Sequence, residues 1–427
     1  MLLDEAHNKI QELQEKEHYT TYQEDLGFKK ELTILRNDFY YQMTAVKEES
    51  VSLVDFLYQP FDTMSGDAYT ARKINEFQTV YLVLDGMGKG LSASLTAMIM
   101  TSFTNHIIDK MLQHNHFDLY LLIFETLHYI QNTLLADEAL AIDYILIDDE
   151  NNLMSYAKFA MPVLLMQNNK DEIIRLKSNN PPMSKYQNDF KVSNYDISDI
   201  KKFLFYSDGI VENETIHKNK PYSKFIEEDF KNSFTRKELT NNIFSKLSTQ
   251  EDDLTLIFIH KLDLNKNTLM RKHSFNTTLN QVDIANEWYE TVLDECCELK
   301  DVKYKAGLVF TEFFMNAYEH GNLGVGSQTK HQLLSNNTYF ETLLQREKKC
   351  SKTISVIVKK IRHLSNTYII TTISDEGKGF NTQILSEIFR NSQTFNGRGV
   401  FVSRTNSMGI YYNALGNSVL YIHKIAS

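Results

Sequence analysis

The sequence has 427 residues, of which 42% are hydrophobic and 23% are charged, and its formal net charge is -10. This length and composition predict two or three folded domains and exclude a largely disordered protein. The net negative charge argues against duplex nucleic acid as the main partner, because phosphate binding needs a cationic surface. Three cysteines are too few for a disulfide framework.

The sequence also lacks the signals of export or membrane insertion. The N-terminus has no basic segment followed by a long apolar run, and no stretch approaches 18 consecutive apolar residues. We therefore expect a cytoplasmic protein without a membrane anchor.

Residues 1–43 are polar, contain no proline and have a single glycine, which predicts a helical arm. The apolar positions form two short seams, the second made by Phe28, Leu32, Leu35 and Phe39. We expect the arm to pair with a second copy and to set the activity of the next domain through its position. The alternative is that the arm packs on its own domain, because two short seams are marginal as an independent coiled coil.

Residues 44–262 contain short apolar runs that predict buried strands. These runs lie at residues 79–84, 143–147, 202–207 and 254–259. A helical stretch of roughly 45 residues begins at Leu91, between the first two runs. The mixture places this region in the α+β class. A polar linker is expected around Asp263–His273, and a second α/β region follows it.

Acidic residues stand at the ends of three of the predicted strands, and one more lies upstream. They are Asp85, Asp208, Asp252, Asp253 and, in the sequence SGD, Asp67. Carboxylates that several strands present to one cleft suit Mg²⁺ or Mn²⁺, which prefer oxygen ligands. Two such ions can activate a shared water for attack on a phosphoryl group. The backbone carbonyl of Gly86 can join them, because the glycines of DGMGKG allow a tight turn.

The order of these segments carries a family resemblance. Five segments resemble the PPM phosphatases in their bacterial SpoIIE/RsbU branch, namely SGDAY, VLDGMGKGLSASL, AMPVLL, YSDGIVE and EDDLTL. The glycine-rich segment is not a Walker loop, since Gly90 follows Lys89 where that motif needs serine or threonine. The chain departs from the family at Phe159-Ala160-Met161-Pro162, where the family often has Ala-Gly-His/Met-Pro.

This resemblance implies a PPM-type β-sandwich flanked by helices, with Mn²⁺- or Mg²⁺-dependent protein-serine/threonine phosphatase activity. It also implies a two-metal site, to which it assigns Asp67, Asp85, Gly86, Asp208 and Asp252, with Asp253 beside them.

A second group of polar residues lies in residues 270–427. Glu312, Asn316 and Glu319 occur at helical spacing, with Glu312 and Asn316 one turn apart on one face. The sequences ISDEGKGF and NGRGVFVSR follow, the first of them after the β-rich run YIITTI. An asparagine oxygen can hold Mg²⁺ on nucleotide phosphates, and glycines let backbone amides approach them. Asp375, at the end of a strand, is placed to accept a hydrogen bond from an adenine amino group.

The ordered set resembles the GHKL ATPases, in the branch of the RsbW-like anti-sigma kinases, because no helix with a phospho-accepting histidine precedes it. The resemblance implies a GHKL-type α/β sandwich that binds ATP with Mg²⁺. In it Glu312 would be the base, Asn316 the Mg²⁺ ligand and Asp375 the adenine contact. It places further residues around the phosphates, namely Gly377, Gly379, Gly397, Arg398 and Gly399. An insertion at about residues 326–352 separates the helix motif from the next strand.

Together the two resemblances imply a bacterial partner-switching regulator. The phosphatase would dephosphorylate a STAS-type anti-anti-sigma protein, and the ATP-binding part would bind or phosphorylate the same class of protein. A sigma factor is a further expected partner, an upstream receiver or sensor domain is the expected input, and a homodimer is the expected assembly. The alternative is a non-enzymatic regulator that sequesters a sigma factor or another partner, with the phosphatase fold as a scaffold.

Overall fold

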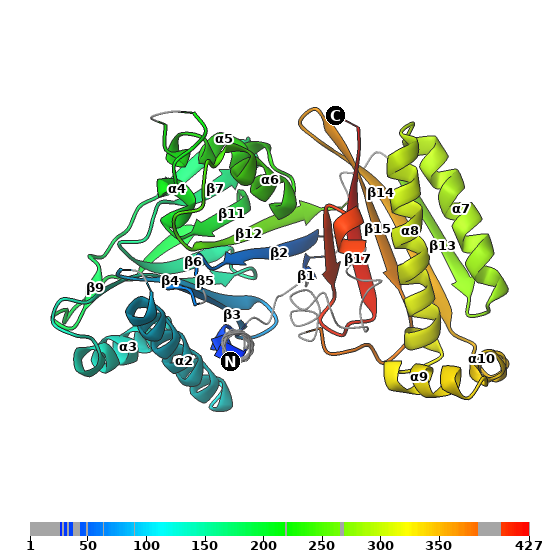
Figure 1. Ribbon diagram of the computed structural model, residues 1–427, viewed down its shortest axis with the longest axis horizontal. Coiled ribbons are helices and arrows are strands. Elements are labelled where there is room, and N and C mark those ends of the chain that lie inside the picture. Colours follow the sequence, from blue (N-terminus) through cyan, green and yellow to red (C-terminus); the bar gives the residue numbers. More distant parts are fainter. Residues whose placement is uncertain are drawn as a thin grey trace, which may run out of the picture. The chain divides into compact units, whose positions relative to one another are not determined.

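The structure is a computed structural model, and it describes residues 26–27, 30–31, 34–36, 43–47, 50–62, 64–88, 90–217, 220–264, 269–382 and 403–426 (Figure 1). The chain divides into two compact units. The first comprises Met1–Asp38, Phe56–Glu227 and Ile243–Ile257, and the second comprises Phe39–Asp55, Glu228–Asn242 and Phe258–Ser427.

Two sheets carry the phosphatase-like sequence motifs. The first has the strand order β1 (Met43–Lys47), β2 (Ser50–Gln59), β12 (Leu254–Asp263), β11 (Ile200–Tyr206), β7 (Leu164–Asn168) and β8 (Ile173–Leu176). The second is antiparallel and has the order β10 (Ser193–Asp196), β6 (Leu153–Phe159), β5 (Ala139–Asp148), β4 (Gln78–Gly86) and β3 (Asp67–Lys73), with β9 (Met183–Ser184) paired to β5.

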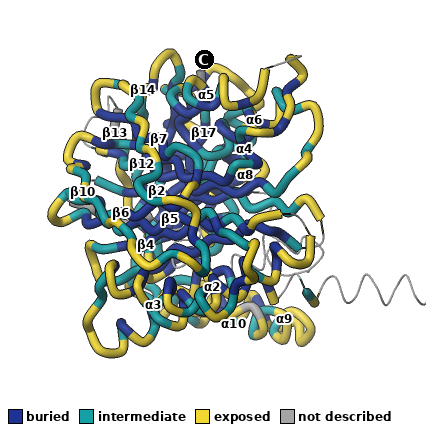
Figure 2. Tube along the Cα trace, turned by 90° about the vertical axis from the view of Figure 1, so that its left-hand side faces the viewer, coloured by how far each residue is buried: buried dark blue, intermediate teal, exposed yellow. Residues whose placement is uncertain are grey.

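The two sheets form a sandwich flanked by helices. The ring of Tyr81 on β4 stacks on that of Phe205 on β11, with centroids 5.8 Å apart. Helices α2 (Leu91–Gln113) and α3 (Leu119–Thr133) cover the outer face of the second sheet (Figure 1). The shorter helices α4 (Gly209–Glu212), η1 (Tyr222–Lys224), α5 (Ile226–Asn232) and α6 (Arg236–Lys246) follow β11 in the chain. The strands carry the long buried stretches of the chain (Figure 2).

The predicted strands and helices of this region are confirmed. The four apolar runs are β4, β5, β11 and β12, and the helical stretch that begins at Leu91 is α2 followed by α3. In β4 every residue from Thr79 to Leu84 is buried, because its two faces meet the other sheet and the helices. Continuous apolar runs are what such doubly covered strands require. The α+β class is therefore confirmed.

The second unit contains one antiparallel sheet with helices on one face. Its strand order is β13 (Leu269–Asn276), β14 (Thr353–His363), β15 (Asn366–Ser374), β17 (Ser418–Ala426) and β16 (Gly409–Tyr412). Helices α7 (Asn280–Cys296) and α8 (Lys300–Asn316) lie on one face (Figure 1). Their shared core includes Tyr289 and Phe310, whose rings stack 4.2 Å apart.

The opposite face of this sheet is also apolar and buried within the second unit. Tyr368, Ile370, Leu420 and Ile422 form one cluster with Leu53, Phe234 and Leu262. The ring of Phe234 stacks on that of Tyr368 with centroids 4.3 Å apart. Both faces of the sheet therefore stabilise the unit by removing apolar surface from water.

One sequence-based prediction about this region is wrong. The polar segment expected as a linker around Asp263–His273 is a strand from Leu269 onward, since β13 pairs with β14. The strand lies at the edge of its sheet, and polar side chains such as Lys272 and His273 are exposed there. An edge strand with polar side chains lacks the apolar pattern that identifies a buried strand. The insertion after Gly326 forms α9 (Ser327–Ser335) and α10 (Tyr339–Glu347).

Most of the predicted helical arm lies outside the described residues. No helix in the described part of the chain combines the length and the apolar character that a membrane span requires.

Candidate functional site

Pairing of two strands creates the centre of the acidic site. In the antiparallel ladder of β3 and β4, Asp67 lies directly opposite Asp85. Asp67 is 2% exposed, so its carboxyl group is almost fully removed from water. Like charges directly opposite each other destabilise a sheet, and burial increases that cost. The fold therefore places two carboxyl groups together where sheet stability alone would disfavour them.

The neighbouring strand ends bring two further aspartates to this pair. Asp208 follows β11 and directly precedes α4, and Asp252 lies just before β12, the neighbour of β11 in its sheet. Gly209 allows the two loops to touch, because a Cβ at this position would stand 2.0 Å from the carbonyl oxygen of Asp253. Only glycine permits so close an approach.

The pKa values of the paired carboxyls show how closely these charges interact. Burial raises the pKa of Asp67 to about 8, and the hydroxyls of Ser207 and Thr255 offset only part of this rise. Burial, followed by the charges of Asp67 and Asp208, raises the pKa of Asp85 to about 10. Sequence reasoning missed the two hydroxyls, although Ser207 directly precedes one of the predicted ligands.

These residues fit a divalent cation in two respects. The Oδ2 atom of Asp67 is buried and makes no hydrogen bond of ordinary geometry. The neighbouring groups of Asp85 and Asp208 are oxygen donors whose mutual repulsion a cation would relieve. Within the described ranges, no three His, Cys, Asp or Glu side chains already stand together as a complete set of metal ligands. The fit therefore rests on the Asp67–Asp85 pair and its acidic neighbours.

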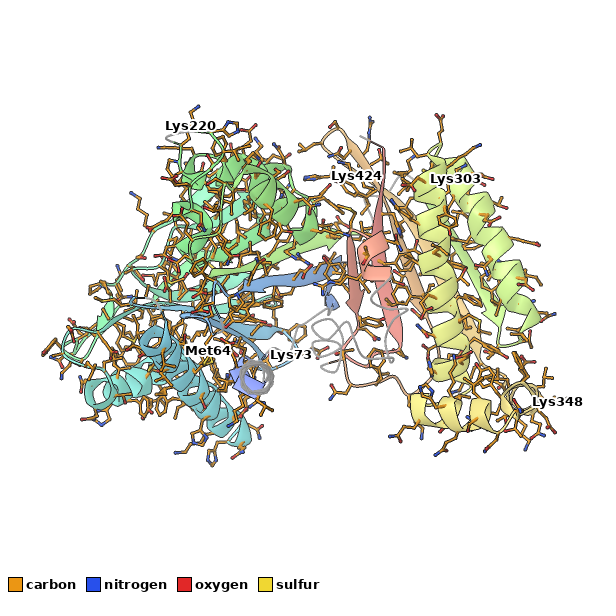
Figure 3. All side chains as sticks on the ribbon, viewed as in Figure 1. Met64, Lys73, Lys220, Lys303, Lys348 and Lys424 are labelled. Carbon is orange, nitrogen blue, oxygen red and sulfur yellow. The ribbon has the colours of Figure 1, made fainter. Side chains whose placement is uncertain are left out.

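Asp253 holds a loop in place at this site. Its two carboxylate oxygens accept the backbone N–H groups of Phe61 and Gly66, each at 2.7 Å. The carbonyl oxygen of Gly66 in turn accepts the N–H of Gly86 at 3.0 Å. Met64, labelled in Figure 3, belongs to the same loop. Asp253 thus connects the loop before β3 to Gly86 at the end of β4.

The segment that departs from the family pattern has an unusual backbone. Ala160, between β6 and Met161, has φ of 57°, in the left-handed region that glycine adopts more easily. The side chain of Met161 is buried. The loop therefore keeps a left-handed turn even though alanine occupies the position.

In the second unit, the candidate nucleotide residues come from α8 and from the end of β15. The Asn316 amide donates to Oε1 of Glu312 at 3.2 Å, as their one-turn spacing predicts. The N–H of Gly377 donates to Oδ1 of Asp375 at 2.7 Å. A Cβ at Gly321 would stand 2.3 Å from the Asp375 carboxyl carbon, so this segment approaches Asp375 closely.

The remaining candidate residues of this unit do not all lie beside Asp375. Gly379 has φ of 70°, which favours glycine. Glu319 lies in η2 (Ala317–Asn322), which follows α8. It is buried, accepts from Lys330 at 2.5 Å and from the Tyr339 hydroxyl, and so holds α9 and α10 against η2. The other predicted phosphate contacts lie outside the described residues; they are Gly397, Arg398 and Gly399.

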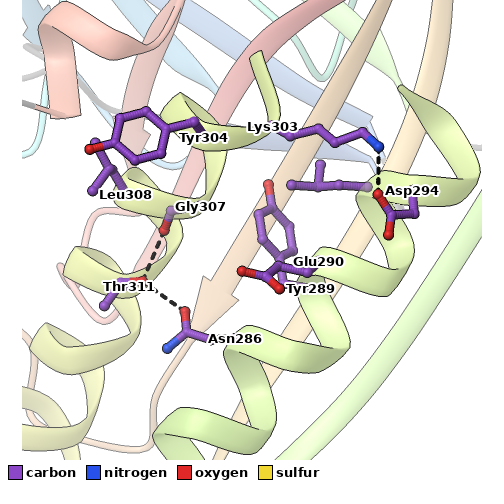
Figure 4. A pocket seen from close by; sticks show the side chains of 10 residues that line it. Asn286, Tyr289, Glu290, Asp294, Lys303, Tyr304, Gly307, Leu308 and Thr311 are labelled. Atoms are coloured by element: carbon purple, nitrogen blue, oxygen red, sulfur yellow. Dashed lines mark hydrogen bonds and ion pairs between the residues drawn. The ribbon is translucent and has the colours of Figure 1, made fainter. Parts of the chain in front are cut away.

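A groove of about 420 Å³ lies elsewhere in this unit, between α7 and α8 (Figure 4). Its lining includes Glu290, Lys303 and Tyr304, and a hydrogen bond from Thr311 to Asn286 crosses it. None of the predicted nucleotide contacts that the structure describes lines this groove. It is therefore separate from the candidate nucleotide site.

Comparison with known proteins identifies one family. Residues 75–261 match the family described as Stage II sporulation protein E (SpoIIE). No curated protein sequence matches the chain at a significant level.

Solved structures that match part or most of this chain include proteins from three bacteria. The SiaA-PP2C domain of Pseudomonas aeruginosa is 17% identical, with a TM-score of 0.42 over 48% of this chain and 85% of that one. The RsbU and RsbW domains of Rv1364c from Mycobacterium tuberculosis are 13% identical, with a TM-score of 0.44 over 88% and 94%. The PP2C phosphatase domain of SpoIIE from Bacillus subtilis, with a fragment of its regulatory domain, is 17% identical, with a TM-score of 0.42 over 50% and 63%. Residues 75–261, which contain Asp85, Asp208, Asp252 and Asp253, are thus the part of the chain that is similar to the SpoIIE family.

Proposed function

We propose that residues 44–262 form a metal-dependent protein-serine/threonine phosphatase that acts on a phosphorylated STAS-type anti-anti-sigma protein in a partner-switching pathway. The observation that carries this proposal is the buried cross-strand pair of Asp67 and Asp85 with Asp208 and Asp252 beside it. The SpoIIE family match supports it independently, because it rests on the sequence.

The proposed ligands for Mn²⁺ or Mg²⁺ are Asp67, Asp85, Asp208, Asp252, Asp253 and the carbonyl of Gly86. When bound, such ions lower the pKa of a coordinated water and stabilise the charge that develops on a phosphoryl group. The chain itself contributes rigid positions, because each carboxyl group stands at a strand end or in a loop tied to one. Asp253 keeps the loop before β3 fixed through two N–H groups. No side-chain nucleophile is needed for this chemistry.

The first prediction concerns the carboxylates themselves. We expect Asp85→Asn and Asp208→Asn to reduce Mn²⁺-dependent phosphate release at least about a hundredfold, on the order of 3 kcal/mol in the barrier. A neutral amide binds a divalent ion more weakly and leaves a coordinated water less acidic. The measurement is phosphate release from p-nitrophenyl phosphate and from a phosphorylated STAS protein.

Asp137→Asn is the matched control, because Asp137 is exposed in the turn before β5. It should retain the wild-type rate. Near-wild-type rates in both site variants at saturating Mn²⁺ would show that the metal assignment is wrong. A wild-type protein that binds the partner but releases no phosphate would favour the alternative of a sequestering regulator.

We further propose that residues 270–427 are a GHKL-type module that binds ATP with Mg²⁺ and acts on, or sequesters, the same class of partner. The hydrogen bond between Asn316 and Glu312, and the close packing of Gly321 and Gly377 on Asp375, support this second function. Asn316 would hold Mg²⁺, Glu312 would act as the base and Asp375 would accept the adenine amino group.

A further inference from the structure

A short described part of the predicted arm lies on the edge of the acidic-site sheet. The carbonyl oxygen of Arg36 accepts the N–H of Ala71 on β3 at 3.1 Å. The side-chain amide of Asn105 on α2 donates to the carbonyl oxygen of Ile34 at 3.0 Å. Strand β3 is the last strand of its sheet, so these arm residues cover an edge that would otherwise be open. An ion pair between Arg36 and Asp109 on α2 completes the attachment.

Further along this segment toward the N-terminus, Glu31 turns into the protein. Glu31 is only 1% exposed. Oε1 of Glu31 accepts the Tyr58 hydroxyl, and it also accepts the N–H of Ser65 at 3.2 Å. A buried carboxylate is costly unless hydrogen bonds satisfy it. Both of these hydrogen bonds to Oε1 come from groups that flank Asp67.

Both partners of Glu31 lead to the backbone of Asp67. The Oγ atom of Ser65 accepts the N–H of Asp67 at 3.0 Å. The Tyr58 hydroxyl lies 3.4 Å from the carbonyl oxygen of Asp67. The ring of Tyr58 also packs edge-on against Tyr69, two residues further along β3, with centroids 5.5 Å apart. These contacts hold the backbone of Asp67 on both sides of its Cα, and the hydroxyls of Ser207 and Thr255 act on the carboxyl group itself.

We propose that Glu31 is a positioning residue for the phosphatase site and that it makes the site dependent on the seating of the arm. The inference rests on the proposed phosphatase function. Its carboxylate holds Ser65 and Tyr58, and these two residues fix Asp67. Displacement of the arm removes that support and lets Asp67 depart from the geometry that an ion needs. A signal that moves the arm therefore reaches the metal ligand through Glu31.

Two variants of the full-length protein test this role, Glu31→Ala and Tyr58→Phe. Groups that orient a metal ligand typically change metal affinity by about 10-fold to 100-fold. We expect both variants to bind Mn²⁺ at least about tenfold more weakly in calorimetry. In the metal-free protein, we expect faster backbone hydrogen exchange of residues 64–70 in Glu31→Ala. Lys30→Ala is the control, because Lys30 is the exposed neighbour in the same arm and should change neither quantity.

Several outcomes would overturn the inference. One is wild-type Mn²⁺ affinity in both variants. Another is a loss of Mn²⁺ affinity in Glu31→Ala alone. Tyr58→Phe keeps the charge of Glu31 and removes only the hydrogen bond, so such a result would attribute the loss to that charge. If Glu31→Ala does not fold, Tyr58→Phe decides alone. A wild-type protein that binds Mn²⁺ but releases no phosphate would remove the proposed phosphatase activity, while the comparison of Mn²⁺ affinities would still decide the role of Glu31.

Discussion

The carboxyl group of Asp375 titrates closer to neutrality than that of an ordinary aspartate, because burial raises its pKa to about 6. An adenine amino group needs the ionised carboxylate as its acceptor, and the protonated form offers a weaker one. The proposed contact is therefore available above the pKa and is lost as the pH falls through 6. We expect the affinity for ATP with Mg²⁺ to be constant above about pH 7 and to decline below pH 6.

Calorimetry on the full-length chain between pH 5 and 8 measures this profile. Adenosine, which has no phosphate group, should show the same decline. Asp375→Ala and Asn316→Ala should abolish ATP binding, whereas Asp283→Asn, on an exposed position of α7, should leave both affinity and profile unchanged. Unchanged affinity in Asp375→Ala would move the adenine pocket elsewhere and remove the main support for a GHKL module.

The sequence showed the acidic residues of the site but not their supports. Asp85 could be found because it follows an apolar run, and Asp67 because it stands in the sequence SGD just upstream; the pairing of β3 with β4 brings the two together. Glu31 and Tyr58 carry no such signal, because their contact depends on the path of the arm over β3. The Oδ2 atom of Asp67 is buried without a hydrogen bond. Such a feature depends on atomic packing, which the spacing of residues in the sequence does not encode.

At the scale of strands and helices, a buried ion pair joins β5 to β6. Lys158 lies opposite Asp143, and its Nζ stands 2.5 Å from Oδ2 of Asp143. Burial raises the pKa of Asp143 and lowers that of Lys158, so each group depends on the other to remain charged. Removal of one partner leaves an uncompensated charge in the sandwich.

We expect Lys158→Met to lower the free energy of unfolding by about 3 to 5 kcal/mol, and the double variant with Asp143→Leu to regain most of that loss. Urea denaturation of the two single variants and the double variant measures the coupling. Independent, additive losses would show that the two side chains do not stabilise each other.

The elements that sequence reasoning located are those with a one-sided or continuous apolar pattern. Strands β4, β5, β11 and β12 have long buried runs and were predicted. Strand β13 was missed because it is an edge strand with exposed polar side chains. Helices α9 and α10 are held by polar contacts to Glu319, which no periodicity shows.

At the scale of the whole molecule, the arm has two proposed roles, which are support of the acidic site and pairing of two copies. Deletion of the whole arm removes both at once. Removal of residues 1–43 should lower phosphate release and also halve the mass seen by light scattering, if the arm both supports the site and pairs two copies. Removal of residues 1–25 keeps Glu31 and the residues that cover β3. We expect this shorter deletion to change the mass of the assembly seen by light scattering but to keep most of the phosphatase activity.

Activity and mass form the two readouts of these deletions. If the longer deletion retains both the wild-type mass and the wild-type specific activity, the arm contributes only packing. The described arm residues already contact β3 and α2 of their own chain, which favours local packing for that part of the arm. Pairing of two copies remains a prediction for the rest.

If the opposed aspartates on β3 and β4 hold an ion as proposed, the folding equilibrium also becomes a sensor of the ion supply. An ion that binds only the folded chain stabilises it by about 2.7 kcal/mol at one hundred times its dissociation constant. Melting curves can therefore rank Mn²⁺, Mg²⁺ and Ca²⁺ without any substrate, and Asp85→Asn should flatten the response. In a cell short of the preferred ion, the loss of this stabilisation would expose the chain to proteolysis, so the amount of protein, and not only its rate, would follow the metal supply.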